Sequence, residues 1–119
     1  MATIRITNLR LRTIIGIYDW EKKTKQDVVL NITIYYDGAK PCRSDNINDT
    51  IDYKALTKKI IKKIESTKFK LIEKLGAVVL KIVLENPLVE EATVRVDKPG
   101  ALRFADSVSV ELTKRRDEE

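Results

Sequence analysis

Alternating apolar and polar residues predict four β-strands in this 119-residue chain. The clearest is segment 27–37, where every second residue is apolar: Val28, Leu30, Ile32, Ile34 and Tyr36. That two-residue period is typical of a strand with one buried face. The segment before Gly16 alternates twice in opposite phases, and the change of phase near Asn8 predicts a bulge or a short turn. Segments 89–98 and 101–112 are predicted to be the third and fourth strands.

Two helices are predicted between the second and third strands. Leu56, Ile60 and Ile64 recur at helical spacing, in a helix that Asp49 or Asp52 can cap. A second helix runs from about 71 to 85, and its apolar stripe consists of Leu71, Ile72, Leu75, Val79, Ile82 and Val83. Segment 38–49 is rich in Gly, Pro, Ser, Asn and Asp and is predicted to be a loop.

The order β-β-α-α-β-β predicts an α+β fold in a single domain that spans residues 1–119: a four-stranded antiparallel sheet with both helices on one face. The opposite face is polar and carries Asn31, Thr33, Tyr35, Thr93, Arg95, Ser107 and Ser109. It therefore meets water or packs against another subunit. Pairing of edge strands between copies would close a barrel from several subunits, so we expect a homo-oligomer.

The absence of histidine excludes several classes of chemistry. With no histidine and one cysteine, we expect no zinc site and no other metal. A serine or cysteine nucleophile activated by histidine is excluded. Catalysis would have to use Lys, Glu, Asp, Tyr or ordered water, without a cofactor. Cys42, beside basic residues in the predicted loop, is expected to be an exposed thiol.

The formal charge of +5, from 23 basic and 18 acidic residues, admits an anionic partner without requiring one. Lysine pairs on the helices are typical of a solvated face. No aromatic residues are interleaved with them, as they are in proteins that stack single-stranded bases, so we expect no nucleic-acid partner. The first residues lack the apolar region of a secretion signal, and no apolar run could span a bilayer. We therefore expect a soluble cytoplasmic protein without membrane contact.

Lys98 occupies a position where strand alternation calls for a buried aliphatic residue. Val94 and Val96 precede it in the same phase, and Pro99 and Gly100 follow, a pair typical of a type II turn. The lysine can simply reach solvent from the end of the strand. Held partly buried beside a rigid turn, it could instead have a lowered pKa and exchange protons near neutral pH.

Three further residues each have a structural and a functional interpretation. Glu73 is either a solvated helix glutamate or a carboxylate in a shallow uncharged pocket, able to accept two parallel N–H donors from an amidine-like edge. Tyr53 shares a helix face with Leu56 and is either a core anchor or a hydroxyl at the edge of a site. Glu21 lies in a loop before two lysines and would ordinarily be exposed to solvent.

Four motifs together resemble the family of dihydroneopterin aldolases and dihydroneopterin triphosphate 2'-epimerases: GIYDWE, INDTIDY, FKLIEKL and DKPGALRFADSVSVEL. The resemblance covers residues 4–112. It implies the tunnelling fold, a β-β-α-α-β-β unit whose copies close antiparallel barrels as tetrameric rings or stacked octamers, with active sites between subunits. It also implies a pterin substrate and the metal-free branch of this fold, since the branch that uses zinc relies on histidines.

The resemblance also assigns roles to individual residues. Glu73 would anchor the pterin ring, and its neighbour Ile72 is placed with it in the substrate-binding set. Lys98 would act as acid and base through water. Tyr53 would come from the neighbouring subunit and transfer protons. Glu21 would line the pocket and is counted among the catalytic residues.

Within this family, the resemblance favours the epimerase branch. NLRLRTIIGI, NINDTIDYKALTK and ALRFADSVSVEL look like the triphosphate epimerases. YDWE and KPGA look like the aldolases, and Gly100 stands where epimerases often carry histidine. We therefore expect 2'-epimerisation of 7,8-dihydroneopterin triphosphate with side aldolase activity. The alternative is the aldolase of folate biosynthesis, which gives 6-hydroxymethyl-7,8-dihydropterin and glycolaldehyde. A more distant alternative is a non-catalytic module that binds an anionic ligand.

Overall fold

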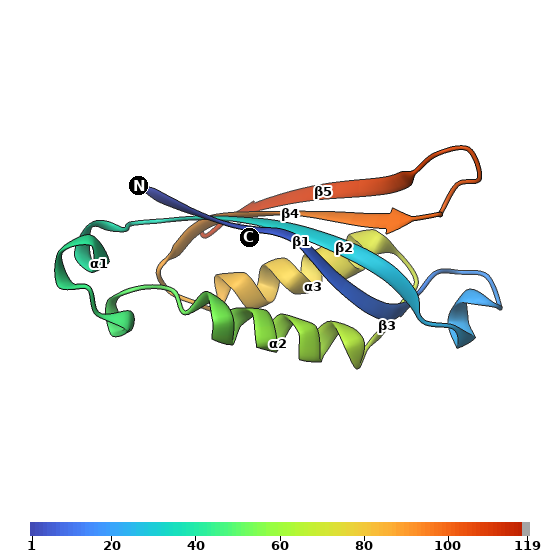
Figure 1. Cartoon of the computed structure of the whole chain (residues 1–119), viewed down its shortest axis with the longest axis horizontal. Coiled ribbons are helices and arrows are strands. Elements are labelled where there is room, and N and C mark those ends of the chain that lie inside the picture. The colour runs from blue at the N-terminus through green and yellow to red at the C-terminus, as the bar shows by residue number, and fades with distance from the viewer. Residues whose placement is uncertain (118–119) are drawn as a thin grey trace.

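A computed structural model describes residues 1–117 and contains five strands and three α-helices (Figure 1). The strands are β1 (Ala2–Ile15), β2 (Gln26–Tyr36), β3 (Lys68–Phe69), β4 (Val89–Pro99) and β5 (Ser107–Arg115). The helices are α1 (Ala39–Ser44), α2 (Tyr53–Glu65) and α3 (Ile72–Leu84), and single 3-10 turns form at η1 (Glu21–Lys23) and η2 (Ile47–Asp49). The predicted α+β class is confirmed.

The sheet has the strand order β3-β1-β2-β4-β5, so the prediction of four antiparallel strands is wrong in two respects. A fifth strand is present, and it makes the sheet mixed. Strand β3 lies parallel to the end of β1, with Ile14 opposite Lys68 and Ile15 opposite Phe69. All other neighbouring pairs are antiparallel. Two residues are too few to show an alternating pattern, so nothing in the segment between the helices predicts β3.

A bulge at Asn8 lets β1 keep one apolar face along its length. The pairing of β1 with β2 slips between Ile6 and Leu9, and Asn8 has a φ of 54°. Asparagine tolerates this left-handed conformation better than most residues. Its main-chain N–H donates to Asn31 Oδ1 at 2.9 Å, and Asn31 Nδ2 donates back to Asn8 Oδ1 at 3.2 Å. The predicted change of phase is confirmed.

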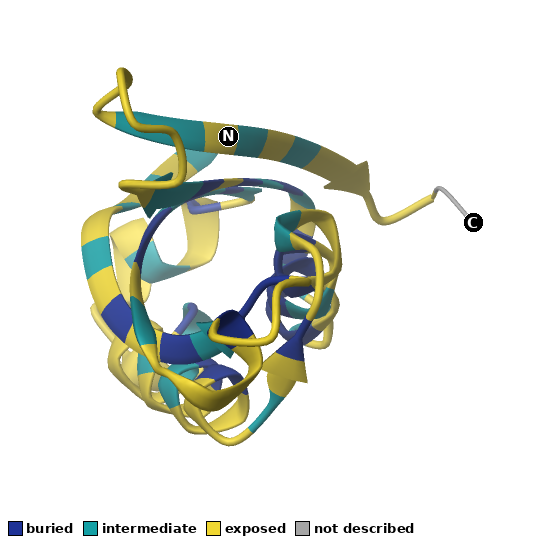
Figure 2. Cartoon of the chain, turned by 90° about the vertical axis from the view of Figure 1, so that its right-hand side faces the viewer, coloured by how far each residue is buried: buried dark blue, intermediate teal, exposed yellow. Residues whose placement is uncertain are grey.

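Helices α2 and α3 cover one face of the sheet, as predicted (Figure 1). Figure 2 shows the buried positions on the sides of helices and strands that face each other. The fully buried side chains of this core include Ile60 and Ile64 of α2, Leu75, Val79 and Val83 of α3, and Leu30, Ile32 and Ile34 of β2. Each such side chain contributes about 1.5–3 kcal/mol when it leaves water, so this contact fixes how the helices lie on the sheet.

The helix boundaries follow from local hydrogen bonding. Helix α2 begins after Asp52, whose Oδ1 accepts a bond from the N–H of Ala55 at 3.0 Å, so Asp52 rather than Asp49 is the N-cap. Helix α1 lies in segment 38–49, where the prediction of a loop is wrong. Pro41 falls in its first turn, where main-chain N–H groups have no partner within the helix, so its missing N–H does not prevent the turn.

The strand predicted for residues 101–112 begins only at Ser107. Residues 100–106 form the tip of the β4–β5 hairpin, which projects away from the helices (Figure 1). Within residues 1–117, the outer edge of β5 and most of the outer edge of β1 have no strand partner. The polar face opposite the helices is half-buried or exposed. A single chain therefore leaves both edges of the sheet largely open.

The N-cap of α2 can be tested by a pair of substitutions. We expect Asp52→Ala to lower the free energy of unfolding by about 1 kcal/mol, because the N–H of Ala55 loses its acceptor. Asp52→Asn keeps an oxygen in the same place and should stay within about 0.5 kcal/mol of the wild type. Urea denaturation measures both values. Equal losses in the two variants would contradict the hydrogen-bonded cap.

Candidate active site

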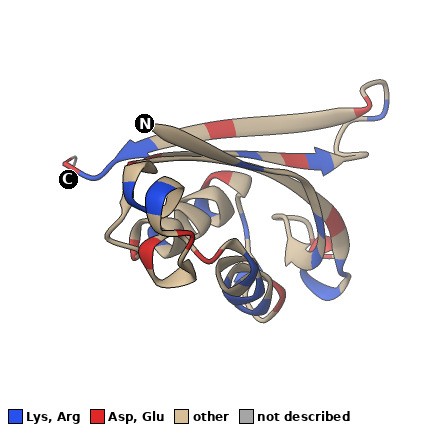
Figure 3. Cartoon of the chain, turned by 60° about the vertical axis from the view of Figure 1, so that its left-hand side comes forward, with Lys and Arg blue, Asp and Glu red and all other residues tan. Residues whose placement is uncertain are grey.

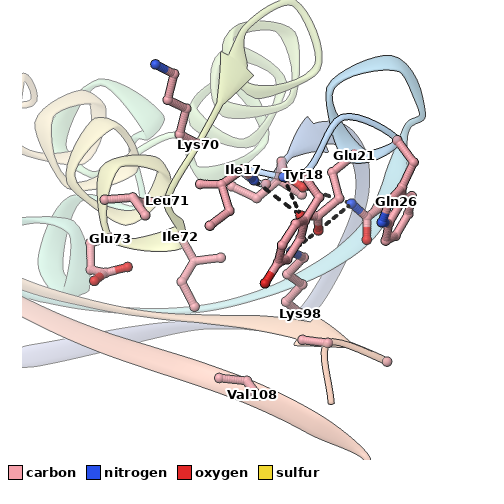
Figure 4. Close-up of a pocket in the computed structure, with 15 residues that line it drawn as sticks. Ile17, Tyr18, Glu21, Gln26, Lys70, Leu71, Ile72, Glu73, Lys98 and Val108 are labelled. Atoms are coloured by element: carbon pink, nitrogen blue, oxygen red, sulfur yellow. Dashed lines mark hydrogen bonds and ion pairs between the residues drawn. The ribbon is translucent and has the colours of Figure 1, made fainter. Parts of the chain in front are cut away.

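A hollow of about 330 Å³ opens at the end of the sheet where β1 and β4 leave it (Figure 4). Three segments form its wall: the loop after β1, the beginning of α3 and the turn after β4. Of the residues predicted for the site, Glu21, Ile72, Glu73 and Lys98 line this hollow. Their positions along the chain differ by up to 77 residues, so only the fold brings them together.

Glu21 is a buried carboxylate at one side of the hollow. Only 4% of the residue is exposed, so the expectation that it would be solvated is wrong. Its Oε1 accepts bonds from the main-chain N–H groups of Ile17 and Tyr18, both at 3.2 Å. Its Oε2 accepts from Lys98 Nζ at 2.6 Å and from Gln26 Nε2 at 3.3 Å. These donors offset the cost of removing a carboxylate from water.

The surroundings of Glu21 strongly favour its ionised form. The hydrogen bond from Lys98 is the largest influence on its pKa, and it outweighs burial, which acts in the opposite direction. The N–H of Tyr18 and the amide of Gln26 lower the value further, so the pKa falls from 4.5 to about 2. Glu21 is therefore a carboxylate at neutral pH and cannot act there as a general acid.

Gly16 makes room for this carboxylate. Its φ is +140°, and a Cβ at this position would overlap the carboxylate of Glu21. The N–H of Gly16 donates to the carbonyl of Phe69 at 3.0 Å, which joins the loop to the strand that leads into α3. Gly16 thus contacts the carboxylate of Glu21 and also the strand that leads to the opposite side of the hollow.

Lys98 is partly buried and continues the inward phase of β4, with 15% of its side chain exposed. The predicted type II turn is present, because the N–H of Ala101 bonds to the Lys98 carbonyl at 3.4 Å and Gly100 has a φ of 74°. Its ammonium pairs with Glu21 and does not extend into solvent. An ammonium has three N–H donors. Within the part of the chain that the structure describes, Glu21 is its one acceptor, so two donors remain for a ligand or water.

Glu73 and Ile72 lie across the hollow from Lys98, in the first turn of α3 (Figure 4). Ile72 is half-buried and adds an apolar surface to the wall. Glu73 is exposed, and among residues 1–117 no cation pairs with its carboxylate. An acidic side chain in the first turn of a helix is stabilised by the helix dipole. The carboxylate of Glu73 is therefore available to accept bonds from a ligand.

Tyr53 does not reach the hollow of its own chain. It is the first residue of α2, at the end of that helix nearest α1, whereas the loop that carries Glu21 lies at the opposite end of the molecule (Figure 1). The residue is 62% exposed, so the interpretation as a core anchor is wrong. Any part that Tyr53 plays at this hollow requires a second chain.

Gln26 belongs to the site, although nothing in the sequence indicates it. Its Nε2 donates to the carbonyl of Ile15 at 2.8 Å as well as to Glu21. A glutamine at the beginning of a strand follows no pattern that separates it from a surface residue. Tyr18 and Trp20 also line the hollow and are largely exposed. Two aromatic residues in a polar loop were the sequence signal that could have placed Tyr18 and Trp20 at a binding site.

Within residues 1–117, no three side chains of His, Cys, Asp or Glu are grouped so that they could hold a metal ion. No helix in that range is long and apolar enough to cross a membrane.

The hollow offers a carboxylate acceptor on one side and, on the other, an ammonium with its paired carboxylate. These groups can hold a polar ligand and move protons on it.

Comparisons with known proteins identify the relatives of this chain. A family model described as dihydroneopterin aldolase matches residues 4–113. The dihydroneopterin triphosphate 2'-epimerase of Pseudomonas aeruginosa is 47% identical over 116 residues, 98% of this chain and 94% of that protein. The protein of the same name from Escherichia coli (strain K12) is 49% identical over 115 residues, covering 97% and 96%. The structure of E. coli dihydroneopterin aldolase in complex with neopterin aligns with a TM-score of 0.91 at 28% identity, over 96% of this chain and 99% of that chain.

The state of Glu21 predicts how stability depends on pH. Because its pKa in the folded chain is about 2, below the ordinary 4.5, Glu21 contributes stability that is present above pH 4.5 and is lost as the pH falls towards 2. Glu21→Gln removes this titration. We therefore expect its deficit in unfolding free energy, relative to the wild type, to be largest at neutral pH and to shrink on acidification. Denaturation curves across this range measure the deficit, and a constant deficit would contradict the ionised pair.

Proposed function

The chain belongs to the dihydroneopterin aldolase family, and from this we propose that it catalyses 2'-epimerisation of 7,8-dihydroneopterin triphosphate, with side activity as an aldolase. Its nearly full-length similarity to two bacterial epimerases supports the choice of main reaction. The observation that carries the mechanism is the contact of 2.6 Å between Lys98 Nζ and Glu21, across the hollow from Glu73. This arrangement suits a substrate with an amidine-like ring edge at one end and a hydroxyl proton to be moved at the other.

Recognition of the pterin ring falls to Glu73 and Ile72 in this proposal. The ring presents N3–H and a 2-amino group side by side, and a carboxylate accepts two such parallel donors with good geometry. Glu73 has no competing cation among residues 1–117, which keeps both of its oxygens available. The apolar surface of Ile72 beside it would contact the face of the ring.

The substrate supplies its own electron sink. Dihydroneopterin has a C=N bond between N5 and C6 next to the side chain. Removal of the 2'-hydroxyl proton breaks C1'–C2' and sends the electron pair into that imine, which leaves an enamine and a two-carbon aldehyde. The aldehyde carries the triphosphate when the substrate does. Re-addition to the opposite face of the aldehyde gives the 2' epimer, whereas protonation of C1' gives 6-hydroxymethyl-dihydropterin and the free aldehyde.

The protein then needs only to move protons and hold the ring. We assign the proton transfers to Lys98, acting through ordered water, and to Tyr53 of a neighbouring chain. Glu21 fixes the position of the Lys98 ammonium through its short hydrogen bond. The N–H groups of Ile17 and Tyr18 and the amide of Gln26 also donate to Glu21, so the carboxylate keeps hydrogen-bond donors while Lys98 exchanges protons.

A second copy of the chain completes the site in this proposal. Exposed apolar side chains border the hollow, namely Ile17, Tyr18, Trp20 and Leu71, and a neighbouring chain would cover them. Tyr53 is exposed on another part of the surface, which makes it available to such a neighbour. The open edges of β1 and β5 provide a way to associate, since pairing between copies would close a barrel, as a tetramer or an octamer.

The aldolase of folate biosynthesis is the second candidate. The description of the matching family model and the likeness to an aldolase bound to neopterin favour it. It uses the same bond cleavage and differs only in the fate of the enamine. A non-catalytic module for an anionic ligand is a distant third, because the ionised carboxylate of Glu21, held against the Lys98 ammonium, would repel an anion there.

Incubation with 7,8-dihydroneopterin and with its triphosphate, followed by chromatography, tests the assignment. We expect the 2' epimer of the triphosphate as the main product and a smaller release of aldehyde. Cleavage of the unphosphorylated substrate as the faster reaction would assign the aldolase instead. Absence of turnover with both substrates would exclude both enzymes.

Substitution of Lys98 tests the shared proton transfer. Lys98→Ala should lower turnover in both reactions by at least about 100-fold, the lower end for general acid–base catalysis. Lys98→Arg keeps the charge, but arginine has a pKa above about 12, so it should preserve binding without restoring turnover. Lys114→Ala, an exposed position on β5, is the control and should keep full activity. Survival of one reaction at the wild-type rate in Lys98→Ala would contradict the common mechanism.

Mixing of two inactive variants tests whether Tyr53 comes from another chain. Lys98→Ala and Tyr53→Phe each lack one group, but a mixed oligomer contains some sites with both. If equal amounts are mixed during refolding, we expect activity to return to about a quarter of the wild type, the fraction of intact pairs under random assembly. Light scattering should show at least a tetramer. No recovery in demonstrably mixed oligomers would contradict the shared site.

A further inference from the structure

A second hollow, of about 800 Å³, lies between α2 and α3 and is lined by six lysines. They are Lys59, Lys62, Lys63, Lys68, Lys74 and Lys81, and all six are exposed. We call this hollow the lysine groove. Its lining includes one acidic residue, Glu85, which pairs with Lys59 at 2.8 Å. Lys and Arg positions recur along the helices on this side of the molecule (Figure 3).

The lysine groove accounts for the whole net charge of the chain. Six lysines and one glutamate give it a charge of +5, which equals the formal charge of all 119 residues. Outside the groove the remaining 17 basic residues match the remaining 17 acidic residues. The groove therefore concentrates on one surface an excess of positive charge as large as that of the whole chain.

Most of this charge has no ion-pair partner among the residues that the structure describes. Among residues 1–117, Lys62, Lys63, Lys68 and Lys74 form no ion pair. Lys59 and Lys63 are four residues apart on α2, a spacing at which like charges destabilise a helix by a few tenths of a kcal/mol. An anion bound between the two helices would remove this repulsion, so occupancy of the groove and stability of the fold are coupled.

The shape and lining of the groove favour a compact anion over a long one. Helices α2 and α3 have 13 residues each, which at about 1.5 Å per residue limits the groove to roughly 20 Å. Its aromatic residue, Phe69, is 4% exposed and cannot stack on bases. Lysine ammonium groups bind phosphate as point charges. A chain of linked phosphates concentrates several negative charges over a short length, which matches this cluster.

We propose that the lysine groove binds a linear polyphosphate group, at a site separate from the catalytic hollow. The two hollows share no lining residue, although they flank the same segment, 68–74. The polyphosphate can belong to inorganic polyphosphate or to a nucleotide. The groove does not depend on the proposed enzymatic function, because none of its residues takes part in the mechanism above.

Two variants of equal charge test the site. The groove variant carries Lys62→Ala, Lys74→Ala and Lys81→Ala, and the control carries Lys54→Ala, Lys58→Ala and Lys114→Ala, three exposed lysines outside the groove. Alanine is the best helix former, so α2 and α3 should fold in both. Calorimetric titration with inorganic triphosphate at low salt should show affinity about tenfold weaker in the groove variant and nearly unchanged in the control. Inorganic triphosphate should also raise the melting temperature of the wild type and of the control only.

Further titrations separate the possible outcomes. Saturating neopterin in the catalytic hollow should leave triphosphate binding unchanged, and complete displacement would overturn the proposal. Equal weakening in the two variants would attribute binding to net charge and overturn it as well. A nucleoside triphosphate that binds more tightly than inorganic triphosphate assigns the site to a nucleotide, and equal affinity assigns it to inorganic polyphosphate. Binding of single-stranded RNA without binding of triphosphate would refute the compact-anion site.

Discussion

A carboxylate that is removed from water needs partners, and this requirement at Glu21 organises the end of the molecule that holds the proposed active site. Lys98 neutralises the charge, the main chain of the loop and Gln26 supply further donors, and Gly16 leaves space for the group. Breaking such a pair by removing one member leaves an unpartnered buried charge, which costs several kcal/mol. The position of Lys98 is therefore a condition for the loop to fold against the sheet, in addition to its proposed role in proton transfer.

Sequence patterns predicted the features of the structure that depend on residues close together along the chain. The strands and the two long helices follow from periodicity, and Lys98 was visible because it interrupts a local alternation. Glu21 was not predicted to be buried, since its burial results from a partner 77 residues away. Strand β3 has two residues, too few for a period, and helix α1 has six residues within a segment rich in residues that usually break helices. Long-range contacts and very short elements carry no local signal.

The proposed site separates recognition from reaction. Glu73 lies on a packed helix, whereas the ion pair is formed between a loop and the end of a strand. Under the proposed mechanism, epimerase and aldolase share every residue up to cleavage. The outcome of the reaction then depends on how long the two-carbon aldehyde stays beside the enamine. In the proposed oligomer, a neighbouring chain that covers the largely exposed apolar border of the hollow would lengthen this stay and so favour re-addition.

Strand β3 connects these two parts of the site. It pairs with the end of β1 so that Phe69 lies opposite Ile15. Beyond this pair, β1 continues through Gly16 to the loop that carries Glu21. Strand β3 continues into α3, which carries Glu73. A shift of this pairing by one residue would move the Glu73 side of the hollow relative to the Glu21 side by about 3.3 Å, which is more than the length of a carbon–carbon bond. Under the proposed mechanism, the distance between the ring anchor and the reacting bond would therefore depend on this two-residue register. A change of the register would be a simple route by which a protein of this fold could come to accept a larger or smaller ring.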